Sequence, residues 1–255
     1  MQPFDTHRPD LARAHDYLLG GRHNFSADRA LAGVLAAARP DLSELLGDNR
    51  EFVGRAAGYA ARQGVRQFLD VGSGLPFVHT VCPGSRVAYV DHDPAVRSYG
   101  ESLLYQNGGA RFLDGDLAEP EALLTSAELG AVIDLNLPVC LVLSMVLHLV
   151  EESTARGVTG VLVRALAPGS YVIISTAASD MRDIEPFFGG LEVVPPGLGD
   201  ARAWGVPDAG PIPARADVVL GGVGRKPLVF WLQHEHRDDP GGFRLVLRVG
   251  RVGGD

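Results

Sequence analysis

The residues best suited to chemistry stand at the end of an apolar run, within the segment Phe68 to Pro76. Asp70 is followed two and four positions later by Gly72 and Gly74. Glycine lets a turn take positive φ and brings backbone N–H groups close to a ligand. A carboxylate beside such a turn suits a cationic group and repels a diphosphate. The pattern therefore predicts a cofactor cradle, the alternative being a glycine turn that binds no ligand.

A second acid, Asp91, distinguishes NAD from S-adenosylmethionine less well than Asp70 does. Asp91 ends the next apolar run, 21 residues after Asp70, where a carboxylate can accept both ribose hydroxyls of either NAD or S-adenosylmethionine. The segment Asp91 to Pro94 is equally suited to start a helix. A dinucleotide-binding turn would usually carry a third glycine at position 77, which here is Phe. Phe77 and the charge of Asp70 both favour S-adenosylmethionine.

A third acidic element follows a third apolar run, in the segment Leu113 to Leu117. Here a carboxylate can accept a hydrogen bond from the adenine amino group. We expect Asp116 to be that ligand and Asp114 to be a solvated loop acid. The three elements together predict an S-adenosylmethionine site. The predicted cofactor-binding residues are Tyr17, Asn24, Asp70, Gly72, Ser73, Gly74, Asp91, His92, Asp116, Leu117 and Ser144.

The elements that must position these residues alternate between strand and helix. Short apolar runs predict strands at Arg66–Val71, Arg86–Val90, Ala110–Leu113, Pro138–Leu143 and Ser170–Ser175, and two later runs, Leu191–Val194 and Asp217–Val223, extend the sheet. Helices are predicted at Pro94–Gln106, Pro120–Ser126 and Ser153–Leu166. Such alternation indicates an α/β fold with a parallel sheet, whose ligands bind at the carboxyl ends of the strands.

The two ends of the chain differ from this central region. Residues 1–64 are predicted to be a helical cap, with Ser26 capping one helix and Asp41 and Glu44 forming a capping box at the next. Residues 65–227 form the predicted cofactor-binding core. Residues 228–255 are predicted to form an extension, in which the strands Leu228–Leu232 and Phe243–Val249 make a β-hairpin. A hairpin alone is marginally stable, so we expect it to dock on the sheet.

Composition excludes several other classes of protein. The chain has 255 residues, a net charge of -8 and only two cysteines. The acidic balance argues against nucleic acid or an anionic membrane as the main partner. The longest apolar run, Leu137 to Val150, is too short to span a membrane, and the N-terminus shows no signal peptide. We expect a cytoplasmic protein without a metal site.

Longer segments give a more specific indication. The stretch RAHDYLLGGRHNFSAD, residues 13–28, resembles a motif of the actinobacterial S-adenosylmethionine-dependent methyltransferases formerly grouped as a domain of unknown function. Further matching segments are Gln67–Pro76, Tyr89–Pro94, Val146–Val150, Leu166–Tyr171, Phe187–Leu191 and Gly221–Pro227. The resemblance implies a Rossmann-like class I methyltransferase sheet of seven strands with an N-terminal helical cap. Between Pro76 and Arg86 the chain is short for this family, so the helix there must be clipped or replaced by a loop.

The N-terminal motif has two interpretations. Tyr17 and Asn24 flank Gly20-Gly21, a helix stop that lets the chain reverse over the mouth of the cofactor site. In one interpretation Tyr17 contacts the cofactor, while Asn24 and Asp28 support the loop. In the other, these residues only cap helices and hold the cap on the sheet.

Catalysis needs little from the protein, because the sulfonium is already activated and methyl transfer requires mainly alignment and exclusion of water. A general base is useful only for a protonated acceptor, and His148 is the best-placed candidate. A structural role for this lone histidine is the alternative. Ser144 can line the methionine pocket.

Three functions remain to be compared. The leading hypothesis is a methyltransferase acting on a small-molecule acceptor, of the kind found in specialised metabolism. The second is a catalytically inactive protein that binds S-adenosylmethionine or scaffolds a partner. The third, an NAD(P)-dependent oxidoreductase, is disfavoured by Phe77 and Asp70. The C-terminal extension either pairs two subunits as a homodimer or is read-through from a shifted frame.

Overall fold

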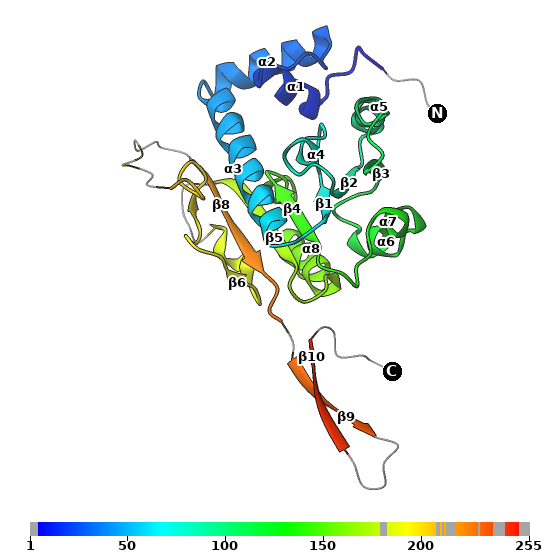
Figure 1. Ribbon diagram of the computed structural model, residues 1–255. Coiled ribbons are helices and arrows are strands. Elements are labelled where there is room, and N and C mark those ends of the chain that lie inside the picture. The colour runs from blue at the N-terminus through cyan, green and yellow to red at the C-terminus, as the bar shows by residue number, and fades with distance from the viewer. Residues whose placement is uncertain are drawn as a thin grey trace.

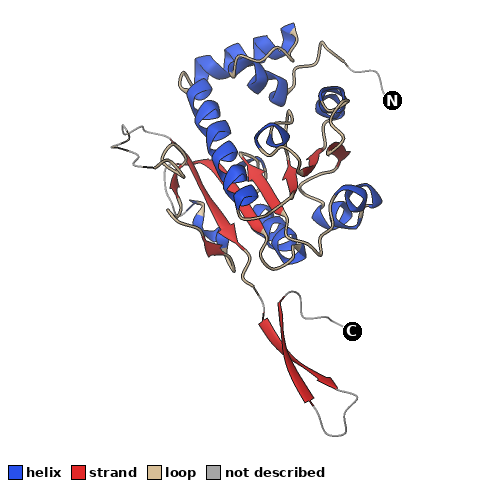
Figure 2. Ribbon diagram, in the orientation of Figure 1, coloured by secondary structure: helices blue, strands red, loops and turns tan. Residues whose placement is uncertain are grey.

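The computed structural model describes residues 5–178, 183–207, 210, 212, 218–228, 230–236 and 243–249. They form an α/β protein whose central sheet has helices on both faces (Figures 1 and 2). Five strands run parallel in the order β3-β2-β1-β4-β5. Their bounds are β1 Gln67–Val71, β2 Arg86–Asp91, β3 Ala110–Asp114, β4 Cys140–Ser144 and β5 Tyr171–Ala178. The predicted α/β class with a parallel sheet is confirmed.

The sheet ends in antiparallel strands. β8 (Val218–Arg225) lies antiparallel to β5, and the short strands β6 (Glu192–Val193) and β7 (Gly199–Asp200) both pair with β8. The described sheet therefore has eight strands rather than the seven that the family resemblance implied, because two two-residue strands share one neighbour. The first of them, predicted as Leu191–Val194, is only two residues long.

Three helices precede the sheet: α1 (Leu11–Leu18), α2 (Ser26–Ala38) and α3 (Leu42–Arg62). In Figure 1, α1 and α2 lie at one end of the molecule, and α3 runs from them across the face of the sheet. The buried side of α3 includes Phe52, Ala56 and Ala60, which join the apolar layer on that face. The same helix thus holds the cap and the sheet together.

Two predicted helix caps are wrong, although both helices begin within one residue of the predicted position. The N-cap of α2 is Phe25 rather than Ser26, and the Asp28 carboxylate accepts a hydrogen bond from the Phe25 N–H at 2.7 Å. Asp41 is the N-cap of α3, but its side chain makes no capping hydrogen bond and accepts one from Arg39 Nε at 3.3 Å. In the first case another side chain caps the helix, and in the second the expected capping oxygen is bonded to an arginine. The spacing of residues in the sequence shows neither contact.

The remaining helices cover the two faces of the sheet. α4 (Val78–Val81) and α5 (Pro94–Leu103) share the apolar layer of α3, while α6 (Pro120–Thr125), α7 (Ala127–Val132) and α8 (Glu152–Ala165) share the opposite layer. Short 3-10 turns occur at η1 (Leu147–Leu149) and η3 (Glu185–Phe188). α4 has only four residues, in agreement with the clipped helix expected after Pro76. The short helix α7 was not predicted.

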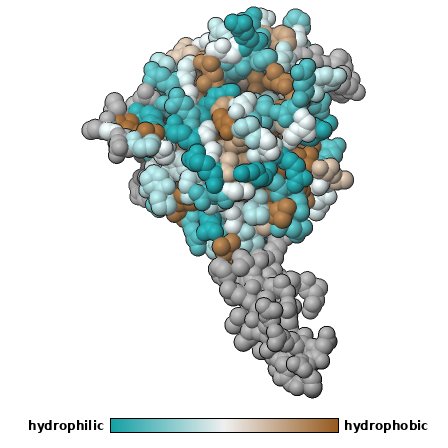
Figure 3. Space-filling view, viewed as in Figure 1, coloured by the Kyte–Doolittle hydropathy of each residue, from teal (hydrophilic) through white to brown (hydrophobic). Residues whose placement is uncertain are grey.

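The C-terminal strands β9 (Phe230–His236) and β10 (Phe243–Val249) pair with each other in antiparallel register. They make a two-stranded sheet of their own, which Figure 1 shows beyond the end of β8 and away from the main sheet. The expectation that this hairpin docks on the main sheet is therefore wrong for the described backbone. On the visible face of the main body, apolar side chains are scattered among polar ones (Figure 3). None of the helices in the described part of the chain has the length and apolar character needed to cross a membrane.

Candidate functional site

Polar side chains gather at the carboxyl ends of the parallel strands. Asp70 pairs in register with Tyr89, and Asp91 pairs with Asp114. Ser144 on β4 pairs in register with Ser175 on β5. Because side chains alternate along a strand, these residues share the face that carries Phe68, Val87 and the buried side of α3. The strand ends thus form one polar edge beneath the helical cap.

The glycine turn follows β1 directly. Gly72 has φ +67° and Gly74 has φ +55°, a conformation that other residues adopt with strain. A Cβ at Gly72 would overlap the side chain of Val146, and one at Gly74 would lie 3.3 Å from Cβ of Ala12 in α1. Space as well as dihedral angle therefore requires glycine at position 72, and at position 74 a side chain would be both strained and tight against α1. Ser73 lies between them, its N–H bonded to the Val90 carbonyl at 3.1 Å.

Asp70 is a buried carboxylate for which the structure shows no hydrogen bond among the described residues. Burial, and then the charge of Asp91, raise its pKa from 3.8 to about 7. A buried carboxylate without a partner is destabilised until a cation or donor reaches it. This is the electrostatic situation that a ligand ammonium group would relieve.

Asp91 is mostly buried and bonded to the neighbouring backbone. One oxygen accepts from the Gly74 N–H at 3.0 Å, and the other accepts from the Asp93 N–H at 3.1 Å. Each carboxylate oxygen has a second lone pair, so both can still accept a ribose hydroxyl. His92 is exposed beside it, with Nδ1 3.8 Å from the Asp91 carboxylate.

At the end of β3, Asp114 and Asp116 are both exposed, whereas Leu117 is buried in the apolar layer opposite α3. Asp116 Oδ1 accepts from the Ala118 N–H at 2.8 Å, which shapes the turn after Gly115. Its other oxygen has no protein partner among the described residues. The predicted role of Asp116 toward an adenine stays a prediction.

The N-terminal motif folds as a buried hydrogen-bonded unit. Arg13 and Asp28 form a buried ion pair at 2.8 Å, and Asp28 also accepts from the Asp10 and Phe25 N–H groups. Asn24 donates to Asp16 Oδ2 at 3.0 Å and to the Gly21 carbonyl at 3.1 Å. Asn24 and Asp28 therefore hold the loop together.

Tyr17 lies at the end of α1, and 44% of it is exposed. No hydrogen bond of its hydroxyl group to another described residue is shown. It is therefore available to a ligand.

A hydrogen-bonded cluster that sequence reasoning missed lies at the ends of β4 and β5. Asn49 of α3 donates to Ser144 Oγ at 2.9 Å, and its Oδ1 accepts from Ser175 Oγ at 2.7 Å. The next residue after Ser144, Met145, has φ +53°, which is rare for a residue with a side chain. Strained backbone of this kind often occurs at functional sites. Asn49 is 95 positions from Ser144, so no local pattern could have joined them.

The side chain of His148 in η1 reaches solvent. Neighbouring atoms still shield part of its imidazole from water, and this desolvation lowers its pKa below the usual range. Desolvation also lowers the pKa of His15 in α1, and the charge of His148 lowers it further. The two imidazoles therefore lie within electrostatic reach of each other. His15 is one helical turn after Ala12, which packs on Gly74, and was not among the predicted site residues.

With this geometry in hand, comparison with known proteins is decisive. A family model described as S-adenosyl methyltransferase matches residues 1–183. This chain belongs to that family. The matched segment contains the glycine turn, the three acidic strand ends and the helical cap, so the predicted cofactor, S-adenosylmethionine, is confirmed at the level of the family.

Two solved structures resemble this member of the S-adenosyl methyltransferase family over most of its length. One is a candidate methyltransferase from Thermobifida fusca YX, 32% identical, covering 88% of this chain and 97% of that one, with a TM-score of 0.78. The other is a DUF574 family protein from Streptomyces avermitilis, 30% identical, covering 88% and 99%, with a TM-score of 0.77. No curated protein matches the chain.

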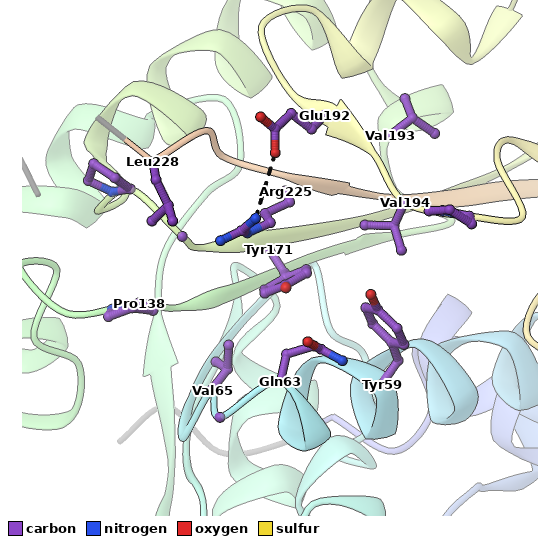
Figure 4. Close-up of a pocket in the computed structure, with 14 residues that line it drawn as sticks. Tyr59, Gln63, Val65, Pro138, Tyr171, Glu192, Val193, Val194, Arg225 and Leu228 are labelled. Carbon is purple, nitrogen blue, oxygen red and sulfur yellow. Dashed lines mark ion pairs between the residues drawn. The ribbon is translucent and has the colours of Figure 1, made fainter. Parts of the chain in front are cut away.

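A cavity of about 540 Å³ lies at the other end of the methyltransferase sheet. Figure 4 shows Tyr59 of α3 and Gln63, the residue that follows α3, on one side and Glu192 on the other, with Arg225 and its ion pair to Glu192 between them. Tyr171, the first residue of β5, also lines the cavity, which is therefore remote from the glycine turn at the carboxyl ends. No cluster of three or more metal-ligating side chains occurs among the residues that the structure describes.

Proposed function

We propose that the chain transfers the methyl group of S-adenosylmethionine to a small-molecule acceptor, and we expect a specialised metabolite as that acceptor. The observation that carries this proposal is the close packing of the cap on the glycine turn, where Ala12 Cβ lies 3.3 Å from the position of a Cβ on Gly74. Because α1 covers the turn and α3 contacts the ends of β4 and β5, an acceptor must fit beneath helices. This arrangement favours a small molecule over a folded macromolecule.

In this proposal the chain orients two reactants and excludes water. Asp70 and the glycine turn hold the amino-acid end of the cofactor, and Asp91 holds the ribose. His148, whose pKa is lowered by desolvation, is largely neutral at pH 7 and so able to accept a proton from the acceptor. When bound, the cofactor supplies the activated methyl group.

A labelling experiment tests the class of acceptor. The protein is incubated with methyl-labelled S-adenosylmethionine and separate small-molecule, protein and nucleic-acid fractions of a bacterial extract. We expect label in the small-molecule fraction, loss of labelling in Asp91→Ala, and full labelling in the surface variant Arg62→Gln on α3. Label that appears only in protein or nucleic acid would contradict the proposal.

The second candidate is a protein that binds the cofactor without transferring its methyl group. The one-turn α4 beside the glycine turn, shorter than the helix that the resemblance to the family implied, favours it. Tight binding of S-adenosylhomocysteine without labelling of any fraction would support this candidate.

We also propose a cytoplasmic location, since Cys82 and Cys140 are buried free thiols. For the extension, we propose that residues 228–255 pair two subunits. Truncation after Pro227 should then halve the mass in solution, and an unchanged monomer would argue against the proposal.

A further inference from the structure

One cation beside the glycine turn has no role in the site described so far. Arg50 lies on α3, and its guanidinium carbon is 4.3 Å from the centre of the Phe77 ring. Phe77 follows the glycine turn by three residues, and α3 packs closely on it, with the position of a Cβ on Gly54 3.5 Å from Phe77 Cζ. The packing of α3 therefore holds the Arg50 guanidinium over the loop that leaves the turn.

Among the described residues, no carboxylate is bonded to the guanidinium of Arg50, and the structure shows neither a hydrogen bond nor an ion pair of this group. The contact that it does make is with the face of the Phe77 ring. Desolvation lowers its pKa, while the charge of Asp16 counteracts this effect. The Asp16 carboxylate instead accepts hydrogen bonds from His23 and Asn24. A guanidinium has five N–H donors and is always charged. Contact with a ring face uses none of these donors in a hydrogen bond, so they remain able to bind an anionic ligand.

Arg50 and Asp70 lie on the same side of the sheet. Asp70 is on the face of β1 that carries Phe68 and is covered by α3, two residues before the first glycine of the turn. Arg50 projects from α3 over Phe77, three residues after the turn. A buried acid and a guanidinium with no carboxylate bonded to it among the described residues thus lie on one face of the sheet, at the beginning and at the end of the glycine turn.

Two other buried or half-buried arginines of the N-terminal helices, Arg13 and Arg55, are already paired. Arg13 lies in the buried ion pair with Asp28. Arg55, one turn beyond Glu51 on α3, donates to the carbonyls of Ala201 and Trp204. Arg50 is thus available for a ligand where these two are not.

A free amino-acid group carries one ammonium and one carboxylate, so a site that pairs both charges has one anionic and one cationic side chain. The anionic side chain is Asp70, and the glycine turn alone supplies no full positive charge. We propose that Arg50 binds the carboxylate of the methionine part of S-adenosylmethionine, opposite the contact of Asp70 with the ammonium group. This inference deepens the proposed function and rests on the placement of the cofactor at the glycine turn. In this arrangement the protein recognises the amino-acid end of the cofactor, rather than its nucleoside, through two pairs of opposite charges.

The test compares two ligands and three variants by calorimetry. S-adenosylhomocysteine carries the carboxylate, whereas its decarboxylated analogue keeps the ammonium and lacks only that group. A charge-assisted hydrogen bond is typically associated with about a 10- to 100-fold change in affinity. We expect Arg50→Gln to weaken S-adenosylhomocysteine by that factor and to leave the analogue unchanged. Arg50→Lys should retain part of the preference, and Arg62→Gln, on the exposed end of the same helix, should behave as the wild type.

An equal loss for both ligands in Arg50→Gln would overturn the inference, because it would indicate that Arg50 only packs on the Phe77 ring. Unchanged binding of S-adenosylhomocysteine would overturn it as well. Should the glutamine variant fail to fold, Arg50→Lys decides: lysine cannot form the bidentate contact, so the preference for the carboxylate-bearing ligand must fall several-fold. If the wild-type protein binds neither ligand, the placement of the cofactor itself fails, which is a distinct result.

Discussion

The pKa of Asp70 makes a prediction about folding that needs no acceptor. Burial raises this pKa from 3.8 to about 7, so the folded protein holds a proton that the unfolded chain releases at lower pH. The contribution of Asp70 to the free energy of unfolding must therefore fall as pH rises from about 4 to about 7 and then level off. The difference between the two pKa values corresponds to roughly 4 kcal/mol, an upper bound because water can relax around the charge.

The perturbation is Asp70→Asn, which keeps the shape of the side chain and cannot ionise. We expect the variant to equal the wild type in stability near pH 4 and to exceed it at pH 8 by about 2–4 kcal/mol without cofactor. Urea unfolding at pH 4.5, 6 and 8 measures this difference. The same change should weaken S-adenosylhomocysteine at pH 8, since the ligand ammonium loses its charged partner.

Cofactor affinity should show the opposite pH dependence. Ionised Asp70 binds the ammonium, so affinity should fall about tenfold for each pH unit below 7 and stay level above it. The Asn variant should lose this dependence. An Asn variant whose stability advantage over the wild type does not grow between pH 4.5 and pH 8, or that is less stable than the wild type at pH 8, would refute the assigned burial of this charge.

Three further predictions concern the turn and its surroundings. Asp91→Ala should weaken S-adenosylhomocysteine by an order of magnitude or more in calorimetry, because it strands two ribose hydroxyls; unchanged affinity would mean that the ribose lies elsewhere. Gly72→Ala should lower the free energy of unfolding by about 1–3 kcal/mol, because the added methyl group overlaps Val146. The control Gly33→Ala lies in open space within α2 and should raise the free energy of unfolding by about 0.5–1 kcal/mol. Equal effects of the two changes in thermal melts would contradict the packing at Gly72. Lys226→Met removes three hydrogen bonds to carbonyls at the end of α8, so it should lower stability by about 1–2 kcal/mol without changing cofactor affinity; a parallel loss of affinity would contradict this local role.

The strands that carry the site were predictable because their signals are local. β1, β2 and β3 are short, largely buried runs that carry an acid at their last or second-last residue and are followed by a turn. Each was expected within one residue of its observed bounds. The requirement for glycine at Gly72 was likewise visible in the sequence. Its structural cause, the side chain of Val146, was not.

The residues that escaped prediction act through contacts between distant segments. Asn49 meets Ser144 and Ser175 only because α3 crosses the ends of β4 and β5. Arg50 was one of many arginines in an acidic chain until packing placed it over Phe77. Asp28 was expected to support a loop, yet its hydrogen bonds also replace the cap assigned to Ser26. Secondary structure follows local pattern, whereas these partners depend on tertiary geometry.

The central claim is that the turn after β1 holds S-adenosylmethionine through charge on its amino-acid end. Isothermal titration of the purified protein with S-adenosylhomocysteine and with NAD, at pH 8, tests it most directly. We predict one molecule of S-adenosylhomocysteine bound per chain, with no binding of NAD and a loss of affinity in Asp70→Asn. Binding of NAD without binding of S-adenosylhomocysteine would contradict it.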